Sequence, residues 1–240
     1  MAAAAKNRFE VRRTQTYQRG SDVLLLWGIG AVEQSAAAEK QKADGGRVVC
    51  LDVGYVRDPP GNNRMFRFSL DGAHPQRWLD DTPDSPHSWQ PTMTETPKLG
   101  GRVLIVDMGP KSIQQYGIVD WARRTVQSLE ARGFSKASMI HRPKPRNPFV
   151  PVPGVAHDTS STMEALLRKS LLVVTHHSNA GVEAVIHGVP VETEDGAAAW
   201  MADKPWTYEN RRSFINRLSR WQCRPSHAGD AWSLLERFIR

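Results

Sequence analysis

The sequence has only two cysteines in 240 residues, Cys50 and Cys223. Two isolated cysteines cannot form a disulfide framework and lack the paired spacing of a zinc site. The first residues, MAAAAKNRFEVRR, lack the apolar core of a signal peptide. No stretch approaches the roughly 18 apolar residues of a membrane-spanning helix. These absences predict a protein of a reducing, cytoplasmic compartment with no membrane span.

Internal repeats and low-complexity tracts are also absent, apart from an alanine-rich N-terminus. Hydrophobic residues make up 40% of the chain and charged residues 24%, which fits a soluble globular protein with a real core. A length of 240 residues suits one large domain or two small ones. The net charge of +7 is compatible with an anionic partner, either nucleic acid or a phosphorylated ligand.

Short apolar runs without clean alternation are typical of strands that are covered on both faces. The runs are Val23–Trp27, Arg47–Val53, Arg102–Asp107, Ser138–His141 and Leu171–Thr175. Amphipathic stretches between some of them predict helices. These stretches are Tyr116–Arg132, Thr162–Lys169 and Asn179–His187, with two more helices in the tail after Arg211. Alternating strands and helices predict an α/β fold with a largely parallel sheet.

Two segments break this alternation. Residues 58–100 are rich in Pro, Asn, Asp, Ser and Thr, and within them RMFRFSL is expected to form one edge strand. Residues 142–158 form a proline-rich connector. Long loops in compact α/β proteins are often functional. We expect a domain boundary near residue 115, before the longest helix, which divides the chain into residues 1–115 and 116–240.

Two adjacent histidines follow the last apolar run, in VVTHHSNAGVEAVIHGVPV (Val173–Val191). Open α/β sheets bind ligands beyond the carboxyl ends of strands, where loops lead into helix N-termini. Ser178 or Asn179 can cap the following helix, whose first amides suit an anion, and the alanine and glycine that follow would let a ligand approach the backbone. The alternative is a capped helix that only packs on a strand. His176 and His177 point to opposite sides and no HExxH motif is present, so we expect no metal site.

Charged residues near other strand ends are further candidates. Arg142 and Lys144 project from a proline-stiffened loop, which suits phosphate binding but also fits a solvated basic loop. Glu183 lies one turn after Asn179, and its carboxylate either accepts hydrogen bonds from ribose hydroxyls or pairs with His187.

Carboxylates stand at two strand ends. Asp52 and Asp107 are each followed by a glycine two residues later, and each is either a general base or a turn-capping residue. His74 is another possible acid–base group, and Lys111 can meet an anion.

The assembled blocks resemble GT-B glycosyltransferases, in particular glycosyltransferase-like proteins encoded by tailed phages. The blocks are LDVGYVRD…FRFSLDGAHP, GGRVLIVDMGPKS, HRPKP and THHSN…GVPVETEDGAA, over roughly residues 47–235. HRPKP stands where capsule Kdo-transferases and bacterial sialyltransferases carry a short HP-type motif near the donor phosphates. This chain has Lys-Pro at that position and is short for the family. The resemblance implies a compact GT-B-like α/β fold of two Rossmann-like halves with mostly parallel sheets. The N-terminal half would serve the acceptor and the C-terminal half the nucleotide-sugar.

The resemblance also implies residue roles. Arg142 and Lys144 match the phosphate-contact block, the His177–Asn179 turn matches the donor contacts, and Glu183 matches a position near the ribose. Asp52 is the preferred base for the acceptor hydroxyl and Asp107 the second choice, while His176 is expected to have a packing role. The expected substrate contacts are Tyr55, Arg57, His74, Lys111, Arg142, Lys144, His177, Ser178, Asn179 and Glu183.

These roles describe a metal-independent glycosyltransferase that needs no cofactor besides its nucleotide-sugar donor. The predicted acceptor is a hydroxymethylated base in phage DNA, in the host cytoplasm, with Arg57, Arg64 and Arg67 close to backbone phosphates. The alternatives are a surface glycan or lipid-linked sugar as acceptor, a non-catalytic nucleotide- or DNA-binding module, and a nucleotide-sugar epimerase. The sugar, the nucleotide and the oligomeric state do not follow from the sequence.

Overall fold

The computed structural model describes residues 10–55, 65–85, 90–97, 99–144 and 149–239. The chain forms two compact units, one of residues 1–90 with 216–240 and the other of residues 91–215. The predicted boundary at residue 115 falls inside the second unit, near the end of a short helix. The tail returns to the first unit because it adds a strand and a helix there, which a boundary drawn along the sequence could not include.

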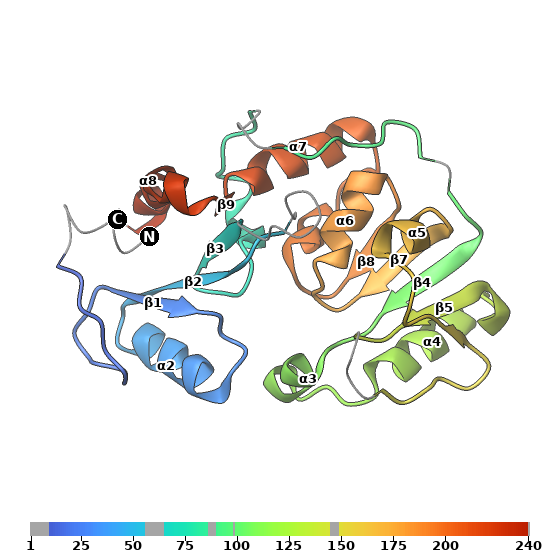
Figure 1. The fold of residues 1–240 in the computed structure, drawn as a ribbon, viewed down its shortest axis with the longest axis horizontal. Coiled ribbons are helices and arrows are strands. Elements are labelled where there is room, and N and C mark those ends of the chain that lie inside the picture. The colour runs from blue at the N-terminus through green and yellow to red at the C-terminus, as the bar shows by residue number, and fades with distance from the viewer. Residues whose placement is uncertain (1–9, 56–64, 86–89, 98, 145–148, 240) are drawn as a thin grey trace. The chain divides into compact units, whose positions relative to one another are not determined.

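The first unit contains a mixed four-stranded sheet of order β1-β2-β3-β9 (Figure 1). Its elements are β1 (Val23–Trp27), α2 (Val32–Ala43), β2 (Arg47–Val53), β3 (Phe66–Leu70), the 3-10 turn η1 (Gln76–Trp78), β9 (Gln222–Cys223), the 3-10 turn η4 (Pro225–His227) and α8 (Ala228–Ile239). Strand β1 runs parallel to β2, whereas β3 is antiparallel to both β2 and β9. The expected edge strand RMFRFSL is therefore an interior strand, because β9 from the tail pairs with its outer side.

Aromatic side chains from the tail complete the core of the first unit. The Trp221 side chain is fully buried, lies 5.4 Å from the Phe68 ring and donates from Nε1 to Thr82 Oγ1 at 2.9 Å. Helix α8 packs through Phe238, whose ring centroid is 5.5 Å from that of Trp221 and 5.3 Å from that of Trp78. Residues more than 130 positions apart in the sequence thus share one core.

The second unit contains a five-stranded, all-parallel sheet of order β6-β5-β4-β7-β8 (Figure 1). Its strands are β4 (Arg102–Val106), β5 (Met139–Arg142), β6 (Ala156–His157), β7 (Ser170–Thr175) and β8 (Val191–Thr193). Its helices and 3-10 turns are α3 (Pro110–Tyr116), α4 (Trp121–Ala131), η2 (Lys136–Ser138), α5 (Met163–Leu167), α6 (Ala180–His187) and η3 (Ala197–Met201). Helix α7 (Tyr208–Ser219) leads from the second unit into the tail.

Both faces of this sheet are covered, as the apolar runs predict. Val103 and Ile105 on β4 pack with Trp121, Val126 and Leu129 of α4. Side chains of successive strand residues point to opposite faces. The next residues along β4, Leu104 and Val106, accordingly pack with residues of α5 and α6 on the other face. The predicted strands and the α/β fold class are confirmed.

The helix predicted over residues 116–132 is confirmed over most of its length as α4 (Trp121–Ala131), but it begins five residues later than predicted. Helix α3 ends at Tyr116, and Gly117 adopts a left-handed conformation with φ of 65°, which glycine tolerates at helix ends. Asp120 is also left-handed, with φ of 58°, immediately before α4 begins. The apolar periodicity spans this break, so it could not reveal it.

Candidate functional site

The parallel strands of the second unit bring several polar loops to one edge of the sheet. The chain starts at the central strand β4 and adds β5 and β6 on one side of it. It then crosses over and adds β7 and β8 on the other side of β4. Open α/β sheets bind ligands at this kind of switch point, beyond the carboxyl ends of the strands. The relevant loops follow β4 (from Asp107), β5 (from Pro143) and β7 (from His176).

Asp107 is fixed at this edge by two hydrogen bonds. Its Oδ1 accepts from the Met108 amide at 2.7 Å, and its Oδ2 lies 3.0 Å from His141 Nε2. The His141 side chain is wholly buried on β5, whereas the Asp107 side chain keeps 18% exposure. A buried histidine thus holds a carboxylate that solvent can reach. The sequence offered no sign of this pairing, because the two residues come from neighbouring strands.

The two predicted phosphate contacts differ in their surroundings. Arg142 is buried, and its Nη1 and Nη2 donate to the carbonyls of Asp158 and Ser161 at 2.8 and 2.9 Å. Its guanidinium therefore holds the loop after β6 through these two hydrogen bonds. A phosphate contact by Arg142 stays a prediction. Lys144 is exposed, and its stem lies over Gly109, where a methyl group would be 3.6 Å from Lys144 Cγ.

Lys111 lies exposed in the first turn of α3, two residues after Gly109. Lys111 and Lys144 together bring two exposed cations to the loop that contains Asp107.

The two histidines form a chain of contacts with α3. His177 Nε2 lies 2.9 Å from Ser112 Oγ, and the Nδ1 atoms of His176 and His177 are 2.9 Å apart. The ring of Tyr116 lies against both, with centroids at 4.5 and 5.0 Å. A hydrogen bond between two Nδ1 atoms needs one to donate and the other to accept, so the contact holds only if one imidazole leaves its Nδ1 unprotonated.

His176 is buried, with Nε2 3.8 Å from Glu194 Oε2, whereas His177 is partly exposed. The placement of His176 fits its predicted packing role. Ser112, Tyr116 and Glu194 are additional members of this cluster, and no local sequence pattern connects them to the histidines.

The turn before α6 is capped by Ser178. Its Oγ accepts from the Ala180 amide at 3.2 Å, whereas Asn179 makes no side-chain cap bond to the helix. Glu183 is partly buried one turn into α6. The small residues at the start of α6 are there for packing, because a Cβ on the buried Gly181 would lie 3.0 Å from Ala198 Cβ. Approach of a ligand to the backbone amides at this helix start stays a prediction.

The first-unit candidates form a separate group. Asp52 Oδ2 pairs with Arg67 Nη2 at 2.7 Å and Oδ1 accepts from the Val53 amide, while the Asp52 side chain stays 39% exposed. Tyr55 and His74 are buried and lie 3.2 Å apart, from the hydroxyl to Nδ1. Burial raises the pKa of the Tyr55 hydroxyl, and the Arg67 guanidinium, 5.0 Å from its ring centroid, opposes that rise.

Three arginines were predicted to approach DNA phosphates. Arg67 is buried in its ion pair with Asp52, so it does not offer a free cation. Arg57 and Arg64 lie outside the described residues.

Among the described residues, no group of three or more His, Cys, Asp or Glu side chains is arranged to hold a metal ion. None of the helices in that part of the chain combines the length and apolarity needed to cross a bilayer.

Comparison with known proteins yields structural neighbours only. No protein-family model and no curated protein sequence matches this chain significantly. The structure is similar to Thermosulfurimonas dismutans KpsC, β-Kdo 2,4-transferase, with a TM-score of 0.53 and 12% identity over 96% of this chain and 90% of that one. It is also similar to the KpsC β-Kdo 2,7-transferase of the same organism, with a TM-score of 0.54 and 11% identity over 89% of this chain and 85% of the other. At this identity the likeness concerns the fold, and it confirms the predicted GT-B-like α/β class.

Proposed function

We propose that the protein is a metal-independent glycosyltransferase that binds a nucleotide-sugar at the switch-point edge of the second unit. One observation carries the proposal. The exposed Lys111 follows Asp107 in the loop into α3 and the exposed Lys144 lies over Gly109 of that loop, at the edge where open α/β sheets bind ligands. The fold, shared with two Kdo transferases, supports the same class of reaction.

The donor phosphates would lie near Lys144 and Lys111, beside the first turn of α6. The N-terminus of a helix is the positive end of its dipole and favours anions. As the bond between the sugar and the phosphate oxygen breaks, negative charge grows on that oxygen. The lysine cations and the oriented helix N-terminus would stabilise this charge.

A carboxylate would take the proton of the acceptor hydroxyl as its oxygen bonds to the sugar carbon. Asp107 and Asp52 remain the two candidates. Asp107 belongs to the same edge as the lysines, and its Oδ2 is oriented by His141. Asp52 has one oxygen engaged by Arg67 and the other by a backbone amide. Both carboxylates thus have both oxygens engaged, and the position of Asp107 at the same edge as the lysines is what makes it the preferred base, which reverses the order that the sequence suggested.

The acceptor stays open between DNA and a glycan. A hydroxymethylated base in phage DNA remains a prediction from the resemblance alone, and of its three proposed arginine contacts Arg67 is committed to Asp52. Both structural neighbours are Kdo transferases, which supports a glycan acceptor more than a DNA acceptor. Nucleotide-activated Kdo is therefore one of the donors to test.

The experiment is a thermal-shift panel of nucleoside diphosphates and nucleotide-sugars, followed by a transfer assay with the donor that stabilises the protein most. A ligand at 100 times its dissociation constant raises stability by about 2.7 kcal/mol. Lys144→Gln should weaken donor binding. Lys136→Gln, which removes a lysine paired with Glu130, serves as the matched control and should leave it unchanged.

Asp107→Asn and Asp52→Asn then identify the base. Removal of a general base lowers the turnover rate by about 10²–10⁴-fold. If transfer survives both substitutions, the assignment of the base is wrong. If the wild type binds a nucleotide but transfers nothing to DNA or to glycans, the protein is a binding module. Release of an altered nucleotide-sugar without an acceptor would indicate an epimerase.

A further inference from the structure

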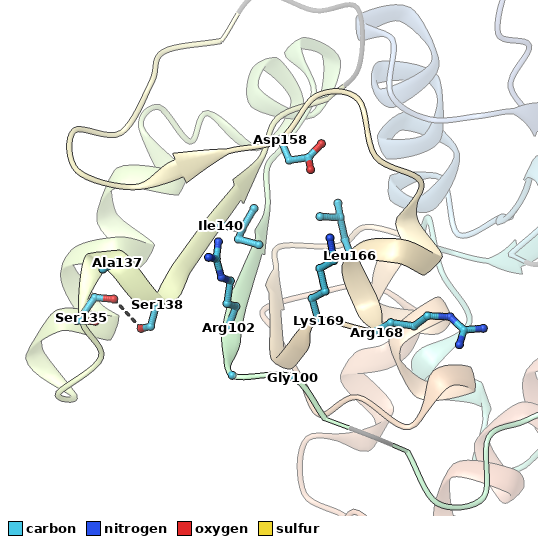
Figure 2. Close-up of a pocket in the computed structure, with 11 residues that line it drawn as sticks. Gly100, Arg102, Ser135, Ala137, Ser138, Ile140, Asp158, Leu166, Arg168 and Lys169 are labelled. Atoms are coloured by element: carbon cyan, nitrogen blue, oxygen red, sulfur yellow. Dashed lines mark hydrogen bonds between the residues drawn. The ribbon is translucent and has the colours of Figure 1, made fainter.

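A hollow of about 840 Å³ opens on the second unit, over the sheet face where Ile140 and Leu166 lie (Figure 2). None of the loop residues that follow β4 or β7 lines it, so it is distinct from the candidate donor site. Small-molecule sites typically have volumes of about 300–1,000 Å³. The hollow is therefore large enough for a ligand of the size of a short saccharide.

Two cations extend into this hollow. Arg102 is the first residue of β4 and Lys169 follows α5, and in Figure 2 both side chains run toward Asp158. Within the described part of the chain, neither has an acidic partner. Arg168 differs, because its side chain turns away and donates to Glu164 Oε1 at 2.7 Å. Arg102 and Lys169 are thus the two lining cations that can bind an anionic ligand.

Asp158, at the other end of the hollow, has the opposite charge. Its Oδ1 accepts from the amides of Ser160 and Ser161, and its Oδ2 accepts from the Ser161 hydroxyl at 2.6 Å. These hydrogen bonds lower the pKa of Asp158 to about 2, so the side chain is charged at neutral pH. Arg142 Nη1 lies 3.5 Å from its Oδ1 and partly balances this charge, whereas Oδ2 can accept a further hydrogen bond from a hydroxyl group.

We infer that this hollow binds a saccharide that carries a carboxylate group. Its carboxylate would meet Arg102 and Lys169, hydroxyls would donate to Asp158, and the apolar face of the sugar ring would lie over Ile140 and Leu166. A polyphosphate or a nucleic acid would satisfy the two cations but would bring further negative charge toward Asp158. The inference does not depend on the proposed transferase activity, since no residue of the donor site takes part.

The test is calorimetric titration at fixed ionic strength with two matched probes, a galactose trisaccharide in which one residue is galacturonic acid and the neutral galactose trisaccharide. The acidic probe should bind and the neutral one should bind at least about ten times more weakly, because two charged contacts are lost. Arg102→Gln and Lys169→Gln should each weaken binding of the acidic probe by about five-fold, as expected for one partly exposed ion pair.

Two control variants make the test specific. Arg168→Gln removes the same charge from the lining but from a side chain that points away, so it should change the affinity by less than about two-fold. Lys144→Gln, in the candidate donor site, should leave saccharide binding unchanged even if it abolishes nucleotide binding. Thermal unfolding of each variant verifies that it is folded.

Several results would overturn the inference. They are equal binding of the neutral probe, no binding of the acidic probe up to millimolar concentration, and a loss in Arg168→Gln as large as in Arg102→Gln. Tighter binding of inorganic pyrophosphate or duplex DNA through the same two cations would indicate a general anion site instead.

Discussion

Replacement of Asp158 by asparagine should destabilise the second unit in a way that depends on pH. The native carboxylate accepts three hydrogen bonds from Ser160 and Ser161, and Arg142 Nη1 lies 3.5 Å from its Oδ1. Asparagine keeps the shape and one acceptor oxygen but loses the charge. The substitution therefore removes the preference of this site for a charged group and leaves the surrounding packing in place.

The magnitude follows from the pKa. These hydrogen bonds, the largest contribution coming from the Ser161 hydroxyl, lower the pKa of Asp158 from 3.8 to about 2. One pKa unit corresponds to about 1.36 kcal/mol of differential interaction, which gives an upper limit of roughly 2.5 kcal/mol. The Asp158 side chain is 25% exposed, so solvent screening reduces the contribution to about 1–2 kcal/mol.

The sign is that of a carboxylate with a depressed pKa. Its contribution is complete above the unfolded-state pKa near 3.8 and is lost as pH falls through about 2. We expect Asp158→Asn to lower the free energy of unfolding by about 1–2 kcal/mol at pH 7. This difference should stay constant down to about pH 5 and shrink between roughly pH 4 and 2.

Urea unfolding of both proteins at a series of pH values is the assay, with the transition of the second unit followed separately. A difference that is zero at pH 7 would refute the reasoning. So would a difference that is the same at pH 7 and pH 2.5, because it would come from packing and not from charge.

Two further substitutions test the packing of the sheet and the support of the candidate site. Gly100→Ala should destabilise the protein by about 1–3 kcal/mol, because its Cβ would lie 2.1 Å from the backbone of Lys169, whereas Gly101→Ala meets nothing within 4 Å and should cost less than about 0.5 kcal/mol. Equal midpoints in urea would contradict this close approach. His141→Ala should cost about 2–4 kcal/mol, because it leaves a cavity and removes the bond to Asp107, while Asp107→Asn retains an acceptor and should cost less than about 1 kcal/mol. Equal losses of unfolding free energy in His141→Ala and Asp107→Asn would show that the buried His141 ring adds no stability beyond its bond to Asp107.

The apolar patterns predicted the strands well because a strand buried between two layers of helices appears in the sequence as a short, continuous apolar run. In the sheet of the second unit, which is covered on both faces, the predicted range Arg102–Asp107 matches β4 to within one residue and Leu171–Thr175 lies within β7. The range Val23–Trp27 also coincides with β1, although β1 is only partly buried. A strand covered on both faces needs apolar residues at every position, so its identity can be read from a few consecutive residues. The same holds for the start of α6, which follows Ser178, a residue type that favours caps.

Where local signals were ambiguous, long-range packing decided the outcome. RMFRFSL became an interior strand because β9, far along the chain, pairs with it. The tail joined the first unit because Trp221 and Phe238 complete its aromatic core. The helix predicted over residues 116–132 begins only at Trp121, because Gly117 and Asp120 adopt left-handed backbone conformations that apolar periodicity does not encode.

Local sequence patterns were enough to predict the fold class, the parallel sheet and the strand ends at which candidate residues lie. Which of these residues come into contact depends on how distant segments pack together. Asp107 and His141 are 34 positions apart, and Ser112 and His177 are 65 apart, so no spacing rule connects them. Parallel strands unite them, because the carboxyl ends of all such strands lie at one edge of the sheet. Arg142 looked like a phosphate ligand in the sequence, but folding directs its donors to the carbonyls of Asp158 and Ser161. A buried guanidinium takes the acceptors that packing brings to it, and those are set by the whole fold.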